Sequence, residues 1–360
     1  MAMLLPVVTA IVTAWVIVTL LVPPISRICH VAGWLDKPGP RKVHARPTPR
    51  LGGVAVFAGL WGALAITALV FPASMQEFDG HTAPIFLSAL LILGVGIWDD
   101  IRPLSGFIKL GAQVVAGMPL WFGGIGFTQL WIPFWGAVEL GWLALPVSAF
   151  WFLILVNAVN MIDGVDGLAT ATTGVAAVTL IWLSWTLHLS PILAASGALL
   201  GALIGFWRYN GSPASIFLGD SGSLTLGHFF AVVALLAPIK RLTALAYFLP
   251  LLALMLPLAE SALSVFRRSV AGIHPFQGDL GHVHHLLLKR GWSENQVVAA
   301  YSITSAVFGL FCVGYRYFNR RWLTLGLAFF VLLLGVTLAI ILRSNVPGPD
   351  ARSGRPAREE

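Results

Sequence analysis

Residues 143–187 read LALPVSAFWFLILVNAVNMIDGVDGLATATTGVAAVTLIWLSWTL, and a polar string separates two long apolar runs within them. Polar side chains occupy every third position of that string: Asn157, Asn160, Asp163 and Asp166. On a straight α-helix each step of three residues turns the side chain by about 60°, so four of them would spread over half of the surface. Gly164 and Gly167 allow the helix to break, with irregular backbone lining a cavity. The stretch predicts two membrane-spanning helices joined by a polar turn.

The composition of the whole chain supports a membrane protein. Of its 360 residues, 58% are hydrophobic and only 10% are charged, and the mean hydropathy is +0.85. Soluble domains are about one-quarter charged, and many apolar segments here approach the roughly 20 residues that cross a bilayer. We predict an all-α polytopic membrane protein with about eleven transmembrane helices, at residues 4–24, 51–71, 83–98, 106–123, 143–158, 167–187, 191–208, 222–238, 243–266, 297–315 and 322–342.

The distribution of basic residues predicts the orientation. Most of the 22 lysine and arginine residues fall on the side that holds the loop after the first span, and basic loops are typically cytoplasmic. The N-terminus is then outside and the C-terminus is cytoplasmic. This assignment also explains the net charge of +7 without invoking nucleic acid. Five residues fall on the other side against the rule: Lys240, Arg241, Arg316, Arg320 and Arg321.

We expect one transmembrane catalytic domain over residues 1–343. Residues 344–360 are polar and rich in proline, glycine and arginine, so they cannot bury a core and are expected to form a disordered cytoplasmic tail. Residues 4–22 are interpreted as a retained span because no basic leader precedes them and no cleavage site follows. The two cysteines, Cys29 and Cys312, lie in different parts of the chain and imply no disulfide framework.

The polar motifs all fall on the predicted cytoplasmic side. Asp99 and Asp100 end the third span, the aspartates of the 157–168 string follow the fifth, and Asp220 precedes the eighth. Histidines precede the tenth span: His282, His284 and His285. Ionisable residues at membrane depth usually mark function. We therefore predict an active-site cleft on the cytoplasmic face.

Each motif has a functional interpretation and a simpler one. Adjacent carboxylates at Asp99 and Asp100 attract a divalent cation, and Mg²⁺ prefers one or two carboxylates with water and substrate phosphates; the alternative is a charged helix cap. Asp220 is also explained as an N-cap, which the helix dipole stabilises. Lys109 reaches back to a phosphate, or is an anchor at the membrane interface. Phe217 stacks on a planar base or packs in the core.

The histidines and the basic loops suggest phosphate binding. The HVHH spacing differs from the i, i+4 pair of a helical zinc site, and Arg267 and Arg268 are near in sequence. Lys42 and His44 lie in a basic first loop, for which contact with anionic lipid is the alternative. Glu260, inside the ninth span, is placed to pair with Arg267 on one helix face.

Together, RKVHARPTPRLGG (41–53), WDD (98–100), NAVNMIDGVDGL (157–168), FLGDSG (217–222) and HVHH (282–285) resemble the polyprenyl-phosphate N-acetylhexosamine-1-phosphate transferase family. Within it the chain looks most like the bacterial UDP-GlcNAc:undecaprenyl-phosphate GlcNAc-1-phosphate transferases. The phospho-MurNAc-pentapeptide branch usually has three consecutive histidines and then an acidic residue, whereas Leu286 follows here. Departures from the family pattern are Glu260, where aspartate is common, and Leu280-Gly281, where a basic residue is common. These departures leave open which sugar the protein transfers, but not the class of reaction.

The resemblance implies that a lipid phosphate attacks the β-phosphate of a UDP-sugar, most simply UDP-GlcNAc, and releases UMP. By the same resemblance, the acceptor would be undecaprenyl phosphate, and the product would begin O-antigen or teichoic-acid-like glycan synthesis at the bacterial inner membrane. A homodimer is a possible assembly. It also implies Mg²⁺ on Asp100 and Asp220, with Mn²⁺ as a substitute, and Asp99 orienting or deprotonating the lipid phosphate. Catalytic roles go to Asp99, Asp100, Asp163, Asp166 and Asp220. The residues that the resemblance implies to bind substrate are Lys42, His44, Lys109, Asn157, Asn160, Phe217, Arg267, Arg268, His282, His284 and His285.

Other functions remain compatible with the sequence. The same reaction with another UDP-HexNAc or with UDP-MurNAc-pentapeptide changes only the sugar, which the 271–290 loop is expected to read. An ion-coupled transporter is a different class, because carboxylates inside membranes also mark ion paths. That function predicts acidic residues in the middle of several spans, whereas here they cluster at one end.

Overall fold

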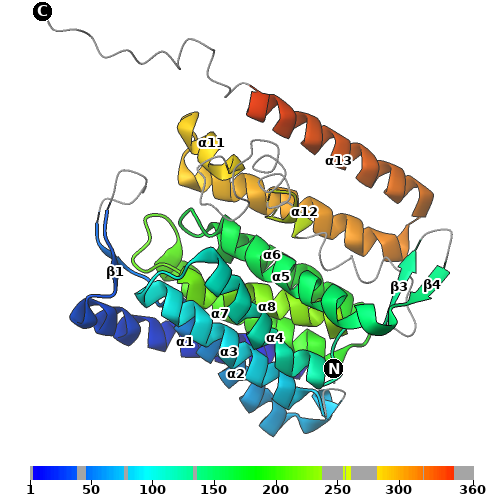
Figure 1. The fold of residues 1–360 in the computed structure, drawn as a ribbon, viewed down its shortest axis with the longest axis horizontal. Helices are drawn as coiled ribbons and strands as arrows, with labels where there is room; N and C mark the ends of the chain where they lie inside the picture. The colour runs from blue at the N-terminus through cyan, green and yellow to red at the C-terminus, as the bar shows by residue number, and fades with distance from the viewer. Residues whose placement is uncertain are drawn as a thin grey trace, which may run out of the picture.

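The protein is a bundle of long, roughly aligned helices (Figure 1). The computed structural model describes residues 3–38, 46–76, 80–132, 136–236, 254–255, 257–260, 282–318 and 320–343. The helices are α1 (Leu4–Ala32), α2 (Gly52–Val70), α3 (Thr82–Ile101), α4 (Gly106–Phe122), α5 (Ala144–Ile162), α6 (Leu168–Thr186), α7 (Ser190–Asn210), α8 (Gly219–Leu236), α11 (Val283–Lys289), α12 (Glu294–Tyr317) and α13 (Arg320–Arg343). Two short ribbons pair β1 (Leu35–Asp36) with β2 (Thr48–Pro49) and β3 (Gln129–Ile132) with β4 (Gly136–Glu139).

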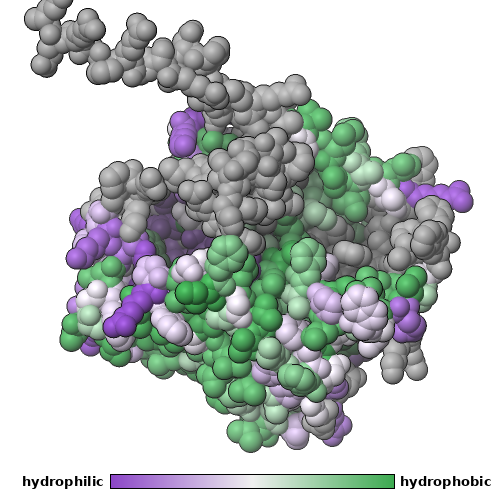
Figure 2. Space-filling view, in the orientation of Figure 1, coloured by the Kyte–Doolittle hydropathy of each residue, from purple (hydrophilic) through white to green (hydrophobic). Residues whose placement is uncertain are grey.

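The prediction of an all-α polytopic membrane protein is confirmed. In the described part of the chain, eight helices are long and apolar enough to cross a membrane. In Figure 2, apolar side chains cover much of the middle of the bundle, and hydrophilic ones lie toward its two ends, including the end where β1 lies. Each predicted span other than 243–266 coincides with a helix. Most of 243–266, like the predicted tail 344–360, lies outside the described residues, so the number eleven stays a prediction.

α1 is longer than predicted, because the helix continues through Pro23 and Pro24 to Ala32. The predicted span 4–24 therefore covers only part of this helix. Proline has no N–H for the carbonyl four residues earlier, and Tyr209 of α7 supplies a donor: its hydroxyl donates to the Thr19 carbonyl over 3.2 Å. A neighbouring helix thus compensates for the bond that Pro23 cannot make.

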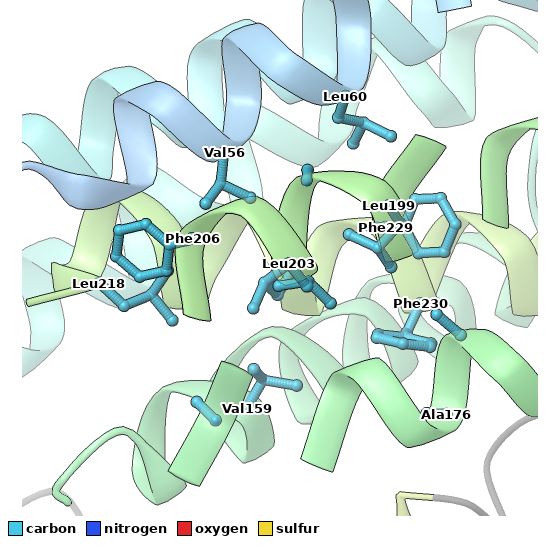
Figure 3. Close-up of a cluster of buried hydrophobic side chains, with 14 of the residues drawn as sticks. Val56, Leu60, Val159, Ala176, Leu199, Leu203, Phe206, Leu218, Phe229 and Phe230 are labelled. Atoms are coloured by element: carbon cyan, nitrogen blue, oxygen red, sulfur yellow. The ribbon is translucent and has the colours of Figure 1, made fainter. Parts of the chain in front are cut away.

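The core lies around α7 and α8, most of whose side chains are buried. Small residues let the helices approach closely; a Cβ at Gly201 of α7 would lie 2.1 Å from the Ile11 carbonyl oxygen of α1. Figure 3 shows buried apolar side chains that fill the space between α2, α5, α6, α7 and α8. These are Val56, Leu60, Val159, Ala176, Leu199, Leu203, Phe206, Phe229 and Phe230.

The segment before α8 is fixed by backbone hydrogen bonds to the start of α2. The Phe217 N–H donates to the Pro49 carbonyl over 2.8 Å, and the Gly52 N–H donates to the Phe217 carbonyl over 3.0 Å. Gly53 lies so close to α8 that a Cβ there would be 1.9 Å from the Gly222 nitrogen. The first loop and the 217–222 motif therefore meet at one end of the bundle, although they are far apart in sequence.

Candidate active site

Asp100, at the end of α3, caps the N-terminus of α8. Its Oδ1 accepts the Asp220 N–H over 2.8 Å, and its Oδ2 accepts the Ser221 N–H over 2.9 Å. Gly219 permits this contact, because its φ is +69° and a Cβ there would lie 2.6 Å from Asp100 Oδ2. The helix cap considered for both aspartates is therefore formed by Asp100, and the Asp220 side chain is left for other partners.

Lys109, from the first turn of α4, joins three elements around Asp220. Its ammonium contacts Asp220 Oδ2 and lies 3.4 Å from both Asp99 Oδ2 and Asn160 Oδ1. Asn160 in turn donates from Nδ2 to Asp220 Oδ1 over 2.9 Å and to Ser223 Oγ over 2.8 Å. The cation therefore neutralises carboxylates from α3 and α8 at once.

The predicted break between α5 and α6 is confirmed. α5 ends at Ile162 and α6 begins at Leu168, after Gly167 with φ of +74°. In the turn between them, Asp166 Oδ2 accepts the Ala214 N–H over 2.8 Å. Burial, with Asp100 and Asp166 nearby, raises the pKa of the Asp163 carboxyl well above its usual range. Added positive charge near this turn would favour the ionised form of Asp163.

These groups surround a cavity of about 350 Å³. Its lining includes many of the predicted site residues: Asp99, Asp100, Asp163, Asp166, Phe217, Asp220 and His285. It also includes polar residues that the sequence did not place in the site: Asp36, Arg50, Asn210 and Glu294. Arg50 is ion-paired with Asp36 across the β1–β2 ribbon. Arg50 belongs to the RKVHARPTPRLGG motif of the basic first loop, whereas Asp36, Asn210 and Glu294 lie in none of the quoted motifs and reach the cavity through tertiary packing.

Other predicted residues lie behind the cavity or cannot be placed. Asn157 exchanges amide hydrogen bonds with Gln113 of α4 over 2.7 and 3.3 Å, and it does not line the cavity. Lys109 and Asn160 act on the cavity through Asp220. The predicted substrate-binding residues Lys42, His44, Arg267 and Arg268 lie outside the described residues.

The α11 histidines form a stack beside the cavity. The His282 and His284 ring centroids are 5.4 Å apart with planes 9° apart, and those of His284 and His285 are 4.4 Å apart. His285 lines the cavity. Burial, followed by the neighbouring His284 and His282, lowers the pKa of His285 to about 4. An imidazole with this lowered pKa is mainly neutral near pH 7, so it offers a ligand a hydrogen bond and no charge.

The charge of the cavity suits a divalent cation. Its described lining holds seven carboxyl side chains and one arginine, an environment that repels phosphates unless a cation is added. The described residues bring no three His, Cys, Asp or Glu side chains close enough to hold one ion. Mg²⁺ needs only one or two carboxylates when water and phosphates complete its shell, so the residues present fit this ion.

Comparison with known proteins identifies the family of the chain. Residues 82–237 match the family model described as glycosyl transferase family 4. The chain is 28% identical to the probable undecaprenyl-phosphate N-acetylglucosaminyl 1-phosphate transferase of Bacillus subtilis, over 91% of this chain and 89% of that one. It is 30% identical to the decaprenyl-phosphate N-acetylglucosaminephosphotransferase of Mycobacterium tuberculosis, over 86% and 82%.

A second branch of relatives is also found. The phospho-N-acetylmuramoyl-pentapeptide-transferase of Clostridium perfringens is 32% identical over 84% of this chain and 94% of that one. The matched region contains α3, α4, α5 and α8, which carry the carboxylates and Lys109. The chain therefore belongs to glycosyl transferase family 4, among the polyprenyl-phosphate N-acetylhexosamine-1-phosphate transferases that its motifs resemble.

Proposed function

We propose that this protein transfers N-acetylglucosamine 1-phosphate from UDP-GlcNAc to undecaprenyl phosphate, on the cytoplasmic face of a bacterial inner membrane. The observation that supports this proposal most directly is that Asp99, Asp100 and Asp220 line one cavity at an end of the bundle. Lys109, behind the cavity, forms ion pairs with Asp99 and Asp220. The named activities of the Bacillus and Mycobacterium relatives support the sugar and the lipid acceptor. The product is expected to start an O-antigen or teichoic-acid-like glycan.

In this proposal a phosphate oxygen of the lipid attacks the β-phosphorus of UDP-GlcNAc. The bond from that phosphorus to the bridging oxygen breaks, UMP leaves with the bridging oxygen, and the lipid diphosphate sugar remains. Such a reaction depends on positioning and on neutralising charge more than on covalent chemistry. The lipid phosphate already carries negative charge, so Asp99 only needs to orient it or remove its last proton.

Asp220 and Asp100 are the proposed Mg²⁺ ligands. Both Asp100 oxygens already accept N–H groups of α8, but each carboxylate oxygen has a second lone pair. When bound, Mg²⁺ would neutralise the diphosphate and the developing charge on the leaving UMP. Lys109 holds Asp220 in place and adds positive charge. Asp163 and Asp166 in the broken turn are proposed to bind the nucleotide sugar, with Phe217 against the uracil.

The reaction itself gives the first test. Purified protein with undecaprenyl phosphate, UDP-GlcNAc and Mg²⁺ is expected to release UMP, to stop when excess EDTA is added, and to recover with Mg²⁺ or Mn²⁺. Release of UMP can be followed by chromatography with the lipid product measured in parallel. UDP-GlcNAc taken intact into vesicles without UMP would instead support a transporter.

The second candidate substrate is UDP-MurNAc-pentapeptide, which is suggested by the name of the Clostridium relative, a phospho-N-acetylmuramoyl-pentapeptide-transferase. The two sugars are separated by competition in one assay. We expect UDP-GlcNAc to be consumed first, because the HVHH string is followed by Leu286 and not by an acidic residue. If the protein used the pentapeptide substrate preferentially, the assigned sugar would change and the assigned class of reaction would stay the same.

Gly164→Ala tests whether the broken turn and α11 form one site. A Cβ at residue 164 would lie 2.9 Å from Nε2 of His284, so the imidazole must move. Misplacement of a site group by about 1 Å can cost about 100-fold in rate, and we expect a loss of up to that size in kcat/KM for UDP-GlcNAc. Gly174→Ala in α6 is the matched control, because a Cβ there meets nothing within 4 Å. Equal activity of both variants would contradict the proposed site.

A further inference from the structure

Glu260 is a buried carboxylate whose partners come from two separate helices. Only 3% of its surface is exposed. The Tyr301 hydroxyl, from α12, donates to its Oε2 over 2.7 Å. Its Oε1 lies 3.0 Å from Nδ1 of His284 and 3.6 Å from Nδ1 of His282. Glu260 is not among the described residues that line the cavity, and the histidines connect it to that cavity through His285.

The geometry determines which imidazole nitrogen faces Glu260. Its Oε1 and the two Nδ1 atoms are buried and have no aligned hydrogen-bond partner among the described residues. Buried polar atoms are normally paired, and these three are the nearest partners for one another. A carboxylate in its ionised form only accepts hydrogen bonds. A slight side-chain rotation would thus align the Nδ1–H of His284 on Glu260, which leaves Nε2 for another partner.

That second nitrogen lies against the active-site turn. Nε2 of His284 would be 2.9 Å, and Nε2 of His285 3.6 Å, from a Cβ placed on Gly164. Both Gly164 and His285 line the cavity. A carboxylate that holds one imidazole nitrogen fixes the tautomer and the ring orientation of that histidine. The orientation of His284 in turn sets the position of His285, whose ring it contacts.

We propose that Glu260, held by Tyr301, is a positioning residue for the nucleotide-sugar substrate. It fixes the tautomer and orientation of His284 and, through that ring, the edge of the cavity formed by His285 and the 163–167 turn. This inference rests on the proposed function, because the substrate it positions is the UDP-sugar. The partner predicted from sequence, Arg267, lies outside the described residues; the described partners are Tyr301 and the histidines.

A double-mutant cycle in the full-length protein tests this role. Partners that orient a metal-bound histidine typically contribute about 10- to 100-fold in metal affinity or activity, and we expect an effect of the same size for an oriented histidine beside the substrate. We expect Glu260→Gln to lower kcat/KM for UDP-GlcNAc by that factor, while KM for undecaprenyl phosphate stays within twofold. Tyr301→Phe should act in the same direction and less strongly. In a His284→Ala background, Glu260→Gln should add less than a twofold further loss.

A different set of results would show that Glu260 only stabilises the fold. Losses that multiply in the double variant, or a rise of both KM values together with a fall in melting temperature, would overturn the proposal. Ser88→Ala is the matched control. It removes a 2.9 Å buried bond to His228, remote from the described cavity lining, and should change neither KM value.

A spectroscopic measurement separates this inference from the proposed function. In ¹⁵N-histidine spectra of the whole protein, the His284 signal, assigned by its loss in His284→Ala, should report a protonated Nδ1 and should shift in Glu260→Gln. A bare Nδ1 in the unmodified protein would overturn the positioning role even if UMP is released. Absence of UMP release with every UDP-HexNAc would overturn the proposed function, while the tautomer result still decides what Glu260 does to His284.

Discussion

Asp220→Asn is expected to lower kcat for UMP release by about 1,000-fold while the protein stays folded. Loss of one preorganised electrostatic contact to the reacting groups typically costs about 100- to 1,000-fold, and Asp220 is also a proposed Mg²⁺ ligand. The substitution removes the negative charge that faces Lys109. It keeps the backbone N–H that Asp100 accepts, so the N-terminus of α8 remains capped. The measurements are single-turnover UMP release and thermal melting in detergent.

Asp100→Asn makes the same chemical change with a different expected outcome. Asp100 accepts backbone N–H groups with both carboxylate oxygens, and asparagine offers only one acceptor oxygen. Loss of a helix cap costs about 1 kcal/mol, so this variant should lose stability as well as activity. An Asp220→Asn enzyme within tenfold of the unmodified protein would contradict the role of Asp220. A fall in its melting temperature as large as that of Asp100→Asn would show that its activity loss is structural.

The gathering of the site at one end of the bundle was predictable from sequence. Hydropathy placed the ends of the spans, and alternation of the loops then put Asp100, Asp163 and Asp220 on one face. The three-residue spacing with Gly164 and Gly167 predicted the broken turn, which the structure confirms. Hydropathy and residue spacing are local patterns with a defined geometry, so they predict these features without knowledge of the packing.

Pairings between distant helices were not predictable in the same way. The sequence does not indicate that Asn157 pairs with Gln113, or that Tyr301 reaches Glu260. The basic first loop marks Arg50 as a candidate, but its place at the cavity beside Asp36 depends on the backbone pairing of residues 49–53 with 217–218. Each contact depends on how helices rotate about their own axes in the bundle. Packing of small residues fixes that rotation, and hydropathy does not report it.

Gly219→Ala is expected to lower the free energy of unfolding more than Asp220→Asn, Asp100→Asn or Gly164→Ala. Gly219 has φ of +69°, and a Cβ there would lie 2.1 Å from the Arg50 carbonyl oxygen. The left-handed conformation costs an L-residue about 1–2 kcal/mol, and overpacking adds about 1–3 kcal/mol. We therefore expect destabilisation of about 2–5 kcal/mol. Activity should fall with it, because the same Cβ meets the Asp100 carboxylate that caps α8.

Gly94→Ala in α3 is the matched control for this substitution. It adds the same methyl group to the helix that ends near Asp100, but a Cβ at residue 94 meets nothing within 4 Å. Within a helix, alanine is favoured over glycine by roughly 0.5–1 kcal/mol, so this variant should melt at or slightly above the temperature of the unmodified protein. Thermal melting and UMP release of the two variants, measured in the same detergent, check the prediction. If Gly219→Ala melts like Gly94→Ala, then the close approach of residues 50, 100 and 219 does not hold α2, α3 and α8 together, and the cavity must be built by other contacts.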